Sequence, residues 1–422
     1  MEQLKPGVFP SEFKLGVNFG SPYQIEGLHP PTDYTTVVNR PPEHGWWNDP
    51  TLQETDFGLA KDLGVRTARI GIEWARLYPE AGKVDRKAVT RYAEMVGELD
   101  TVGIDPIITL HHFTLPEYIA SAGGWANPRI ASWFKEYAQF VAQEIAHEAP
   151  SIVTINEPSV FLLNGYGKGY WPPHKRLSPQ FFLAYANVVR AQTAAYRAIK
   201  DVNPLARVGV SEVLRSFAPA NAVERSEATV RGFLFNELLY ELTLKDFLGV
   251  NYFNVYTLKL SKLQKKPSAQ IARPQDDRGS LINPQHFLTA LENLYRAIKK
   301  PIIVTENGVA DAQDRVRGFY LVFHLLAVAE AIKRGIPIEG YNYWSLTDTY
   351  EWMEKLGTSR FGLVSVDFET MQRIPRKSYY LYQRICREKI VDVDSLTSEF
   401  LTEQEREYLN YCASLLSQGG KA

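Results

Sequence analysis

The sequence predicts an α/β fold: a single (β/α)8 TIM barrel with a short C-terminal helical extension. Eight short apolar runs recur along the 422 residues, and stretches with helical apolar spacing separate them. Such alternation is typical of parallel β/α architecture. A doubly wound nucleotide-binding sheet also alternates, but the chain has neither a GxGxxG motif after its first strand nor a GxxxxGK[ST] motif. Eight repeats therefore favour the closed barrel.

The individual elements follow from the same patterns. The expected strands are Lys14–Phe19, Thr67–Ile70, Pro106–Leu110, Ile152–Ile155, Arg207–Val210, Phe247–Asn251, Ile302–Thr305 and Gly340–Tyr343. The expected helices are Gln53–Leu63, Arg86–Val102, Ile130–His147, Ser178–Val202, Pro284–Ile298 and Arg317–Arg334. Because no linker rich in Gly, Ser or Pro divides the chain, residues 1–390 are predicted to form one catalytic barrel. Residues 391–422 are predicted to form a helical tail packed on it, with a capping box at Thr402–Glu405.

Composition excludes several classes of protein. Hydrophobic residues make up 45% and charged residues 23%, as in an ordinary globular protein, and a net charge of −1 provides no basic field for nucleic acid. Cys386 and Cys412 are too few for a disulfide framework or a four-thiolate zinc site. No run approaches about 18 apolar residues, and the N-terminus lacks the apolar core of a signal peptide. We expect a cytoplasmic protein without a transmembrane segment, and the sequence leaves a homo-oligomer open.

Ionisable and amide side chains collect where the predicted strands end, which is where barrel enzymes carry their reactive groups. Glu157 follows the fourth strand and Glu306 the seventh, so the two acids are expected to face each other across the ring. Opposed carboxyls can divide labour between a nucleophile and a proton donor, with separations of about 5–5.5 Å in retaining glycosidases and about 6.5–9.5 Å in inverting ones. A lone strand-end Glu is more often an N-cap or an ion-pair partner. The flanking Asn156 and Asn307 favour the functional interpretation of the pair.

Other chemistries find less support. His111-His112 is not accompanied by an HExxH motif or a carboxylate triad, so no metal is predicted. No GxSxG motif provides a serine nucleophile, and the lysine-rich segment 259–266 is typical of a solvated loop. We therefore expect no cofactor and a small-molecule partner.

The motifs resemble those of glycoside hydrolase family 1, the β-glycosidases. Glu157 within TINEPSVF is similar to the family's acid/base motif, and Glu306 within VTENGVAD to its nucleophile motif. The resemblance extends to FKLGVNFGSPYQIEG, ARIGIEWARLYP, HHFTLPEYI, GGWANP, DFLGVNYF and YNYWSLTDTYEW, all in the family's order. It covers roughly residues 10–390.

This resemblance implies retaining hydrolysis of terminal β-D-glucosyl residues, with galactosyl and fucosyl residues also accepted, through a covalent glycosyl-enzyme. Glu306 would be the nucleophile and Glu157 the acid/base, while Arg69 and Tyr252 match positions that hold the nucleophile. A neighbouring Arg69 is expected to lower the pKa of Glu306. The positions that match sugar-binding residues are Gln24, His112, Asn156, Glu351 and Trp352 for the hydroxyl groups and Trp344 for the apolar sugar face.

Two alternatives stay open beside this interpretation: a catalytically weak sugar-binding or sensor protein, and a 6-phospho-β-glycosidase. Glu351 disfavours the second, because a carboxylate beside the 4- and 6-hydroxyls repels a 6-phosphate. The sequence also departs from the family at Phe113, where Trp is usual, and in Val223–Lys245, which is short. Phe113 removes an indole N–H donor to the sugar, and the shortened segment predicts a more open mouth that suits alkyl or other hydrophobic aglycones. Transglycosylation is expected wherever a hydroxyl group replaces water.

Overall fold

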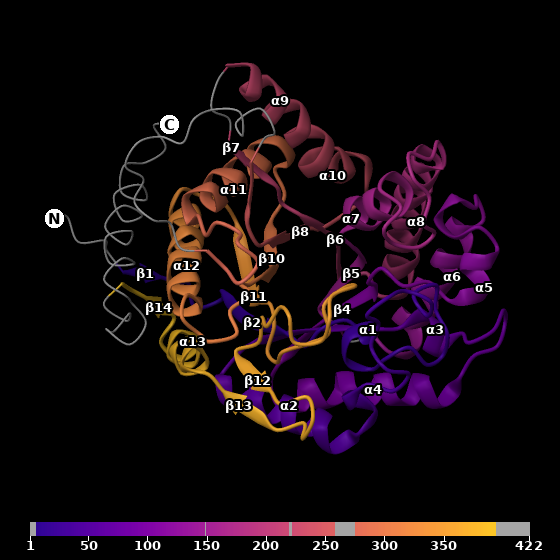
Figure 1. Ribbon diagram of the computed structural model, residues 1–422, viewed down its shortest axis with the longest axis horizontal. Helices are drawn as coiled ribbons and strands as arrows, with labels where there is room; N and C mark the ends of the chain where they lie inside the picture. Colours follow the sequence, from indigo (N-terminus) through magenta and orange to yellow (C-terminus); the bar gives the residue numbers. More distant parts are fainter. Residues whose placement is uncertain (1–5, 148, 219–221, 258–274, 394–422) are drawn as a thin grey trace.

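A closed barrel of eight parallel strands forms the centre of the computed structural model, which describes residues 6–147, 149–218, 222–257 and 275–393 (Figure 1). Around the ring the strands follow the order β10, β11, β2, β3, β4, β5, β6 and β8. Their bounds are β2 Lys14–Asn18, β3 Thr67–Gly71, β4 Asp105–His111, β5 Ser151–Asn156, β6 Arg207–Val213, β8 Phe247–Tyr252, β10 Ile302–Asn307 and β11 Ile338–Tyr343. The predicted barrel and all eight predicted strands are confirmed.

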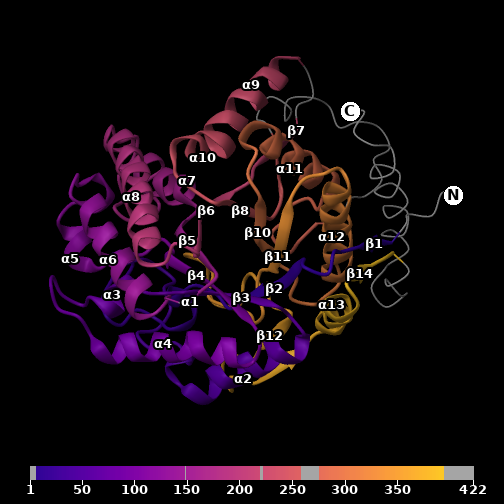
Figure 2. The same cartoon turned by 180° about the vertical axis from the view of Figure 1, so that it is seen from behind.

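Helices surround the barrel in both views (Figures 1 and 2). The α-helices are α1 Pro22–Ile25, α2 Pro50–Leu63, α3 Trp74–Leu77, α4 Arg86–Thr101, α5 Glu117–Ser121, α6 Ile130–Glu144, α7 Pro158–Leu162, α8 Gln180–Val202, α9 Ala222–Gly232, α10 Leu238–Leu242, α11 Pro284–Ile298, α12 Arg317–Lys333 and α13 Lys377–Glu388. The described residues also form short 3₁₀ turns at Trp46–Asn48 and Gly124–Ala126 and π-helical turns at Leu163–Gly167 and Phe233–Glu237. The six predicted helices correspond to α2, α4, α6, α8, α11 and α12, whereas the longer helices α9 and α13 and the short helices α1, α3, α5, α7 and α10 were not predicted.

Within the described residues, three short two-stranded sheets lie outside the ring. β1 (Gly7–Val8) pairs with β14 (Ile390–Val391), β7 (Ser216–Ala218) with β9 (Val255–Thr257), and β12 (Val364–Val366) with β13 (Arg373–Pro375). The predicted helical tail lies outside the described residues from position 394 onward, so it stays a prediction. In the part of the chain that the structure describes, no helix is long and apolar enough to cross a membrane.

Local signals in the sequence explain where the main helices begin and end. Asp49 caps α2 by accepting from the backbone N–H of Thr51 at 2.9 Å, Pro50 occupies the first turn, and Gly64 ends the helix with a left-handed φ of 78°. Asn283 caps α11 in the same way. These helices then pack their apolar sides on the strands.

The interior of the barrel is layered from apolar to polar. Ile107, Val153, Phe247 and Ile303 come from four strands and form one apolar cluster. Later positions on the same strands carry Asn156, Asn251 and Thr305, which are almost completely buried polar residues. The polar layer therefore lies toward the carboxyl ends of the strands, where the apolar layer below it excludes water.

Candidate active site

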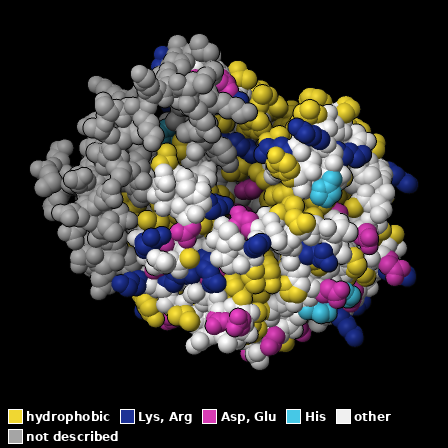
Figure 3. Space-filling model, viewed as in Figure 1, with side chains coloured by type: hydrophobic (Ala, Val, Ile, Leu, Met, Phe, Trp, Pro, Cys, Tyr) yellow, Lys and Arg dark blue, Asp and Glu magenta, His cyan; other side chains and the backbone are white. Residues whose placement is uncertain are grey.

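A pocket of about 220 Å³ opens at the carboxyl ends of the strands. Figure 3 shows a hollow near the middle of one face, with acidic side chains inside it and apolar and basic side chains around it. The pocket is lined by His112, Phe113, Asn156, Glu157, Val160, Trp171, Val213, Phe253, Asn254, Arg278, Glu306, Trp344, Glu351, Trp352 and Phe361. Seven of the ten predicted site residues belong to this wall. Arg69, Gln24 and Tyr252 do not.

Glu306 is held by Arg69, which extends from β3 into the barrel. One Nη of Arg69 donates to the Glu306 carboxylate, and both side chains are at most 5% exposed. The guanidinium is itself fixed, because Nη2 donates to Asn156 Oδ1 at 2.8 Å and Nε donates to Thr109 Oγ1 at 2.8 Å. A planar group with three fixed bonds orients the carboxylate as well as compensating its charge. The predicted contact between Arg69 and Glu306 is present in the structure.

Glu157 accepts a hydrogen bond from a neutral side-chain amide instead of from a guanidinium group. Asn251 Nδ2 donates to Glu157 Oε1 at 2.8 Å and to Asn156 Oδ1 at 3.1 Å. Thr305 Oγ1 donates to Asn251 Oδ1 at 2.7 Å, which fixes the orientation of the amide. Asn251 therefore links the two sides of the pocket, because its own strand, β8, pairs with β10 and its bonds reach β5. Asn251 is not among the site residues predicted from the sequence.

The two carboxyl groups differ in what surrounds them. Burial raises the pKa of both, to about 8 for Glu306, and the contacting Arg69 guanidinium opposes the rise at Glu306. Arg69 lowers the pKa of Glu306 as predicted, but burial outweighs the arginine and the net pKa is raised. The charge of Glu157 also raises the pKa of Glu306, whereas Arg215 and Arg69 lower the pKa of Glu157. The two buried carboxyls therefore disfavour being charged at the same time.

His112 and Asn156 form a second polar group on the wall. Their Nε2 and Nδ2 atoms lie 3.1 Å apart. Burial and the nearby Arg69 hold the pKa of His112 well below its usual value, so the imidazole is neutral. Because Asn156 Nδ2 can only donate, His112 Nε2 accepts and its Nδ1 carries the proton. Both side chains present polar atoms to the same cavity.

Glu351 lies at another part of the wall, in the loop that follows β11. It accepts from Thr349 Oγ1 at 3.2 Å and from Gln24 Nε2 at 3.4 Å. Burial raises the pKa of Glu351 to about 8, and Arg278 is the cation that most opposes this rise. Gln24 is completely buried, and its Nε2 also donates to the Tyr350 carbonyl at 2.6 Å. The structure therefore places Gln24 behind Glu351, where it supports that side chain.

Aromatic side chains form the apolar part of the wall. Trp352 stacks on Tyr23 with ring centroids 4.2 Å apart and meets the Phe113 ring edge-on at 4.8 Å. Trp344 packs in a separate cluster with Ala310 and Phe361. Indole rings supported on one side and open to a pocket on the other provide flat apolar surfaces for the C–H face of a sugar.

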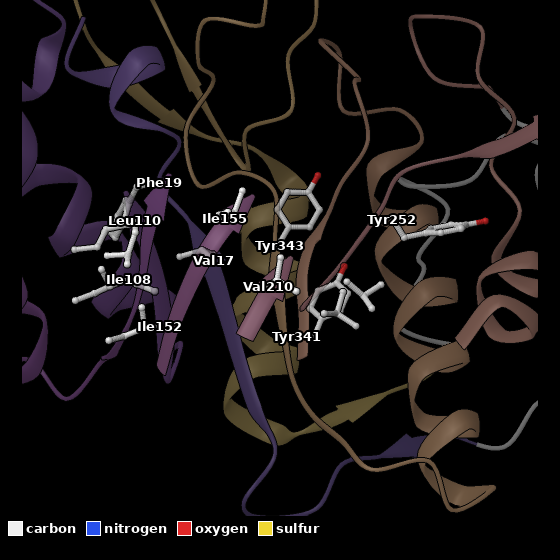
Figure 4. Packing of buried hydrophobic residues seen from close by; sticks show 14 of the residues in the cluster. Val17, Phe19, Ile108, Leu110, Ile152, Ile155, Val210, Tyr252, Tyr341 and Tyr343 are labelled. Atoms are coloured by element: carbon white, nitrogen blue, oxygen red, sulfur yellow. The ribbon is translucent and has the colours of Figure 1, made fainter. Parts of the chain in front are cut away.

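Tyr252 does not reach Glu306. Its hydroxyl donates to the Asn283 carbonyl at 3.3 Å, and its ring stacks on Phe287 of α11 at 4.4 Å. Figure 4 shows the labelled Tyr252 turned away from the strand residues, toward the helical layer. The reason is the alternation of a β-strand: Asn251 points into the barrel, so the next side chain points out. The assignment of Tyr252 as a nucleophile-positioning residue is therefore wrong, and Phe253 is the residue that lines the pocket.

Sequence reasoning also missed three charged residues. Arg278 precedes α11 and lines the pocket, while Glu212 and Arg215 lie at the end of β6 behind Glu157. β6 continues three residues beyond the predicted end at Val210, which brings Glu212 into the barrel wall. Strand alternation could have identified Asn251, but no local signal marks Arg278.

Comparison with known proteins identifies the family of the chain. The model of the family described as "Glycosyl hydrolase family 1" matches residues 51–245 and 236–390. Beta-glucosidase A of Thermotoga maritima is 29% identical over 438 residues, covering 90% of this chain and 98% of the relative. A galactolipid galactosyltransferase of Arabidopsis thaliana is also 29% identical, over 81% of this chain and 58% of its own length. The solved β-glycosidase of Pyrococcus horikoshii superposes with a TM-score of 0.81 at 31% identity, covering 94% of this chain and 99% of that chain.

The family match spans most of the barrel, and Glu157, which follows β5, and Glu306, near the end of β10, both lie inside it. The chain belongs to glycosyl hydrolase family 1 and is a β-glycosidase.

Proposed function

We propose that this enzyme hydrolyses terminal β-glycosides with retention of configuration, with Glu306 as nucleophile and Glu157 as acid/base. The observation that carries the assignment is the asymmetry of their contacts: Arg69 donates to Glu306, whereas Glu157 receives the neutral amide of Asn251. A nucleophile must be charged and a general acid protonated, and these contacts favour that division.

The reaction then proceeds in two displacements. A Glu306 oxygen bonds to the anomeric carbon as the glycosidic C–O bond breaks, and the Glu157 proton moves to the leaving oxygen. Glu306 has become a neutral ester, so the mutual repulsion between the two buried carboxylates is gone, and the ionised Glu157 can accept a proton from water. That water attacks the anomeric carbon and releases Glu306. No metal or cofactor takes part in these steps.

Trapping the intermediate tests the assignment directly. An activated 2-deoxy-2-fluoro-β-glucoside slows both steps, while its good leaving group lets the first one proceed. Mass spectrometry of the intact protein and its peptides should find one sugar on Glu306. An adduct on another residue contradicts the proposal, and no adduct together with no turnover of aryl β-glycosides favours the sugar-binding or sensor alternative.

Glucose is the proposed glycone, with galactose and fucose also accepted. Glu351, His112 and Asn156 supply acceptors and donors for hydroxyl groups, and Trp344 supplies a flat apolar surface. The name of the Thermotoga relative, a β-glucosidase, supports glucose. A 6-phospho substrate is disfavoured because Glu351 and Glu354 place two acidic groups together. Faster hydrolysis of p-nitrophenyl 6-phospho-β-glucoside than of p-nitrophenyl β-glucoside would reverse this preference.

The aglycone is proposed to be apolar. Four other residues that line the pocket offer few hydrogen-bonding groups: Val160, Trp171, Val213 and Phe253. We expect a higher kcat/KM for octyl than for methyl β-glucoside, and equal values would contradict this preference.

Transfer to an acceptor hydroxyl is proposed as a side reaction of the same intermediate. The Arabidopsis relative is named a galactosyltransferase, which supports it. Product analysis with an added alkyl alcohol should detect alkyl glycosides, and their absence at high alcohol concentration would count against transfer. The cytoplasmic location stays a prediction from the sequence.

A further inference from the structure

A buried carboxylate at the end of β6 holds the turn that carries Glu157. Glu212 is 1% exposed and accepts from the Ser159 backbone N–H at 2.9 Å, from Ser159 Oγ at 2.7 Å and from the Val213 N–H at 2.8 Å. Ser159 lies two residues after Glu157, in the first turn of α7. Glu212 therefore binds the start of this helix, where a negative charge is favourable.

The turn needs such support because Glu157 has a left-handed backbone conformation. Its φ is 44° and its ψ is 57°, a region that is sterically unfavourable for a residue with a side chain. The Glu157 N–H donates to the Ser211 carbonyl at 2.7 Å, so β6 holds the turn on both sides of Glu157. These bonds fix the backbone from which the Glu157 side chain extends to accept from Asn251.

Arg215 completes the arrangement. Its Nη1 donates to Ser159 Oγ at 2.9 Å and lies 4.0 Å from Glu212 Oε1, while its guanidinium lies 4.9 Å from the centre of the Phe235 ring. Its backbone N–H and carbonyl both bond to the side chain of Asn236. The guanidinium is thus held next to the first turn of α7 and is 7% exposed as a residue.

We propose that Glu212 and Arg215 are positioning residues that hold the turn of Glu157 and bias its proton in opposite directions through their opposite charges. This inference rests on the proposed role of Glu157 as the general acid. The negative charge of Glu212 favours the protonated form of Glu157, and the positive charge of Arg215 favours the ionised form. The pair together fixes the pH at which Glu157 loses its proton.

The charges around Glu157 are consistent with these opposite effects on its protonation. Arg215 and Arg69 both lower the pKa of Glu157 and burial raises it, while Glu157 in turn raises the pKa of Glu212. Burial raises the pKa of Glu212 to about 7, so its charge is present in the alkaline range. The other titratable groups facing the two carboxyls are Glu306 of β10, neutral His112 after β4, Tyr185 of α8 and Tyr240 of α10.

The test is the alkaline limb of kcat/KM for methyl β-glucoside, which reports the general acid of the free enzyme. Glu212→Gln removes a negative neighbour, so the midpoint should move to lower pH by about one pH unit. Arg215→Met removes a positive neighbour, so it should move to higher pH by a similar amount. Glu212→Asp and Arg215→Lys keep the charges and should stay close to the unsubstituted enzyme.

Two comparisons separate this role from loss of structure. Hydrolysis of 2,4-dinitrophenyl β-glucoside needs little acid assistance, so its kcat/KM near neutral pH should change less than threefold in the charge-removing variants. Asp56→Asn breaks a buried pair with Arg373 away from the pocket and should leave the midpoint unchanged.

Midpoints that stay in place or move in the same direction in Glu212→Gln and Arg215→Met overturn the inference. Because the expected directions differ, either variant decides the question if the other does not fold. An unsubstituted enzyme that hydrolyses no β-glycoside would instead overturn the proposed function.

Discussion

Arg69 and Glu306 meet inside the barrel although their strands, β3 and β10, are separated by β2 and β11 around the ring. The contact needs a long side chain that crosses the interior, and the bonds of Arg69 to Thr109 and Asn156 keep it extended. Glu157 instead accepts its hydrogen bond from the neutral side-chain amide of Asn251. The difference in charge between these partners supports the proposed division of roles between two otherwise similar buried glutamates.

Replacing Arg69 by Met should move the acidic limb of kcat/KM to higher pH by about one pH unit or more. Glu306 would then be buried without its cation, its pKa would rise further, and a higher pH would be needed to ionise it. The sign follows because only the ionised nucleophile reacts. The pH profile measures this directly. An acidic limb that stays in place would show that Arg69 does not control the charge of Glu306, and Arg373→Met serves as a control for the loss of a buried arginine.

Replacing Glu157 by Gln should lower kcat for methyl β-glucoside by about 10²–10⁴-fold. The loss in kcat/KM should be much smaller for 2,4-dinitrophenyl β-glucoside, whose leaving group departs without a proton. Steady-state kinetics with both substrates measures the contrast. Glu73→Gln is a matched control, because Glu73 is a buried carboxyl after β3 whose pKa is raised to about 7 by burial, yet it does not line the pocket. Equal losses on both substrates in Glu157→Gln would contradict the acid role.

The barrel could be predicted because each strand contains a short continuous run of apolar residues, and such a run is visible in the sequence without knowledge of distant contacts. β10, for instance, begins Ile302-Ile303-Val304, and all three are almost completely buried. Glu157, Glu306, His112 and Trp344 could be predicted because strand ends converge at one rim whatever the details of the loops. The pocket brings all four together.

The errors arise where a side chain's direction or a distant contact decides its role. Tyr252 follows Asn251 directly, and a change of one residue along a strand moves a side chain from the barrel to the helical layer. Arg278 acts on Glu351 from a segment 73 residues earlier in the chain. No pattern within a short window reports such a pairing.

Replacing Arg278 by Gln should raise KM for β-glucosides about tenfold with little change in kcat. The pKa of Glu351, already raised to about 8 by burial, would rise further once its opposing cation is gone. Less Glu351 would be ionised at neutral pH, and hydrogen bonds from sugar hydroxyls to a charged acceptor are worth about 1.5–3 kcal/mol. The KM should recover as the pH is raised. Arg278→Lys keeps the charge and should retain most of the affinity, whereas an equal rise of KM in both variants would indicate a role other than charge.

Asp348 offers a test of what holds the loop that carries Glu351 and Trp352. It is completely buried and accepts from Arg376 at 2.8 and 3.0 Å, from Arg360 at 3.0 Å and from the Gly362 N–H at 2.9 Å. Asp348→Asn removes the charge that compensates two guanidinium groups, so we expect the free energy of unfolding to fall by about 3–5 kcal/mol.

Urea unfolding followed by circular dichroism measures this change, and the KM for β-glucosides should rise because the loop is less firmly held. Glu80→Gln is the control, since its pair with Lys83 is about two-thirds exposed on both sides and should change stability by less than about 0.5 kcal/mol. A larger loss of unfolding free energy in Asp348→Asn than in Glu80→Gln would show that the hydrogen bonds of Asp348 stabilise the fold. A loss below about 1 kcal/mol in Asp348→Asn would mean that the arginines find other partners, and the loop would then owe its position to the packing of Trp352 on Tyr23.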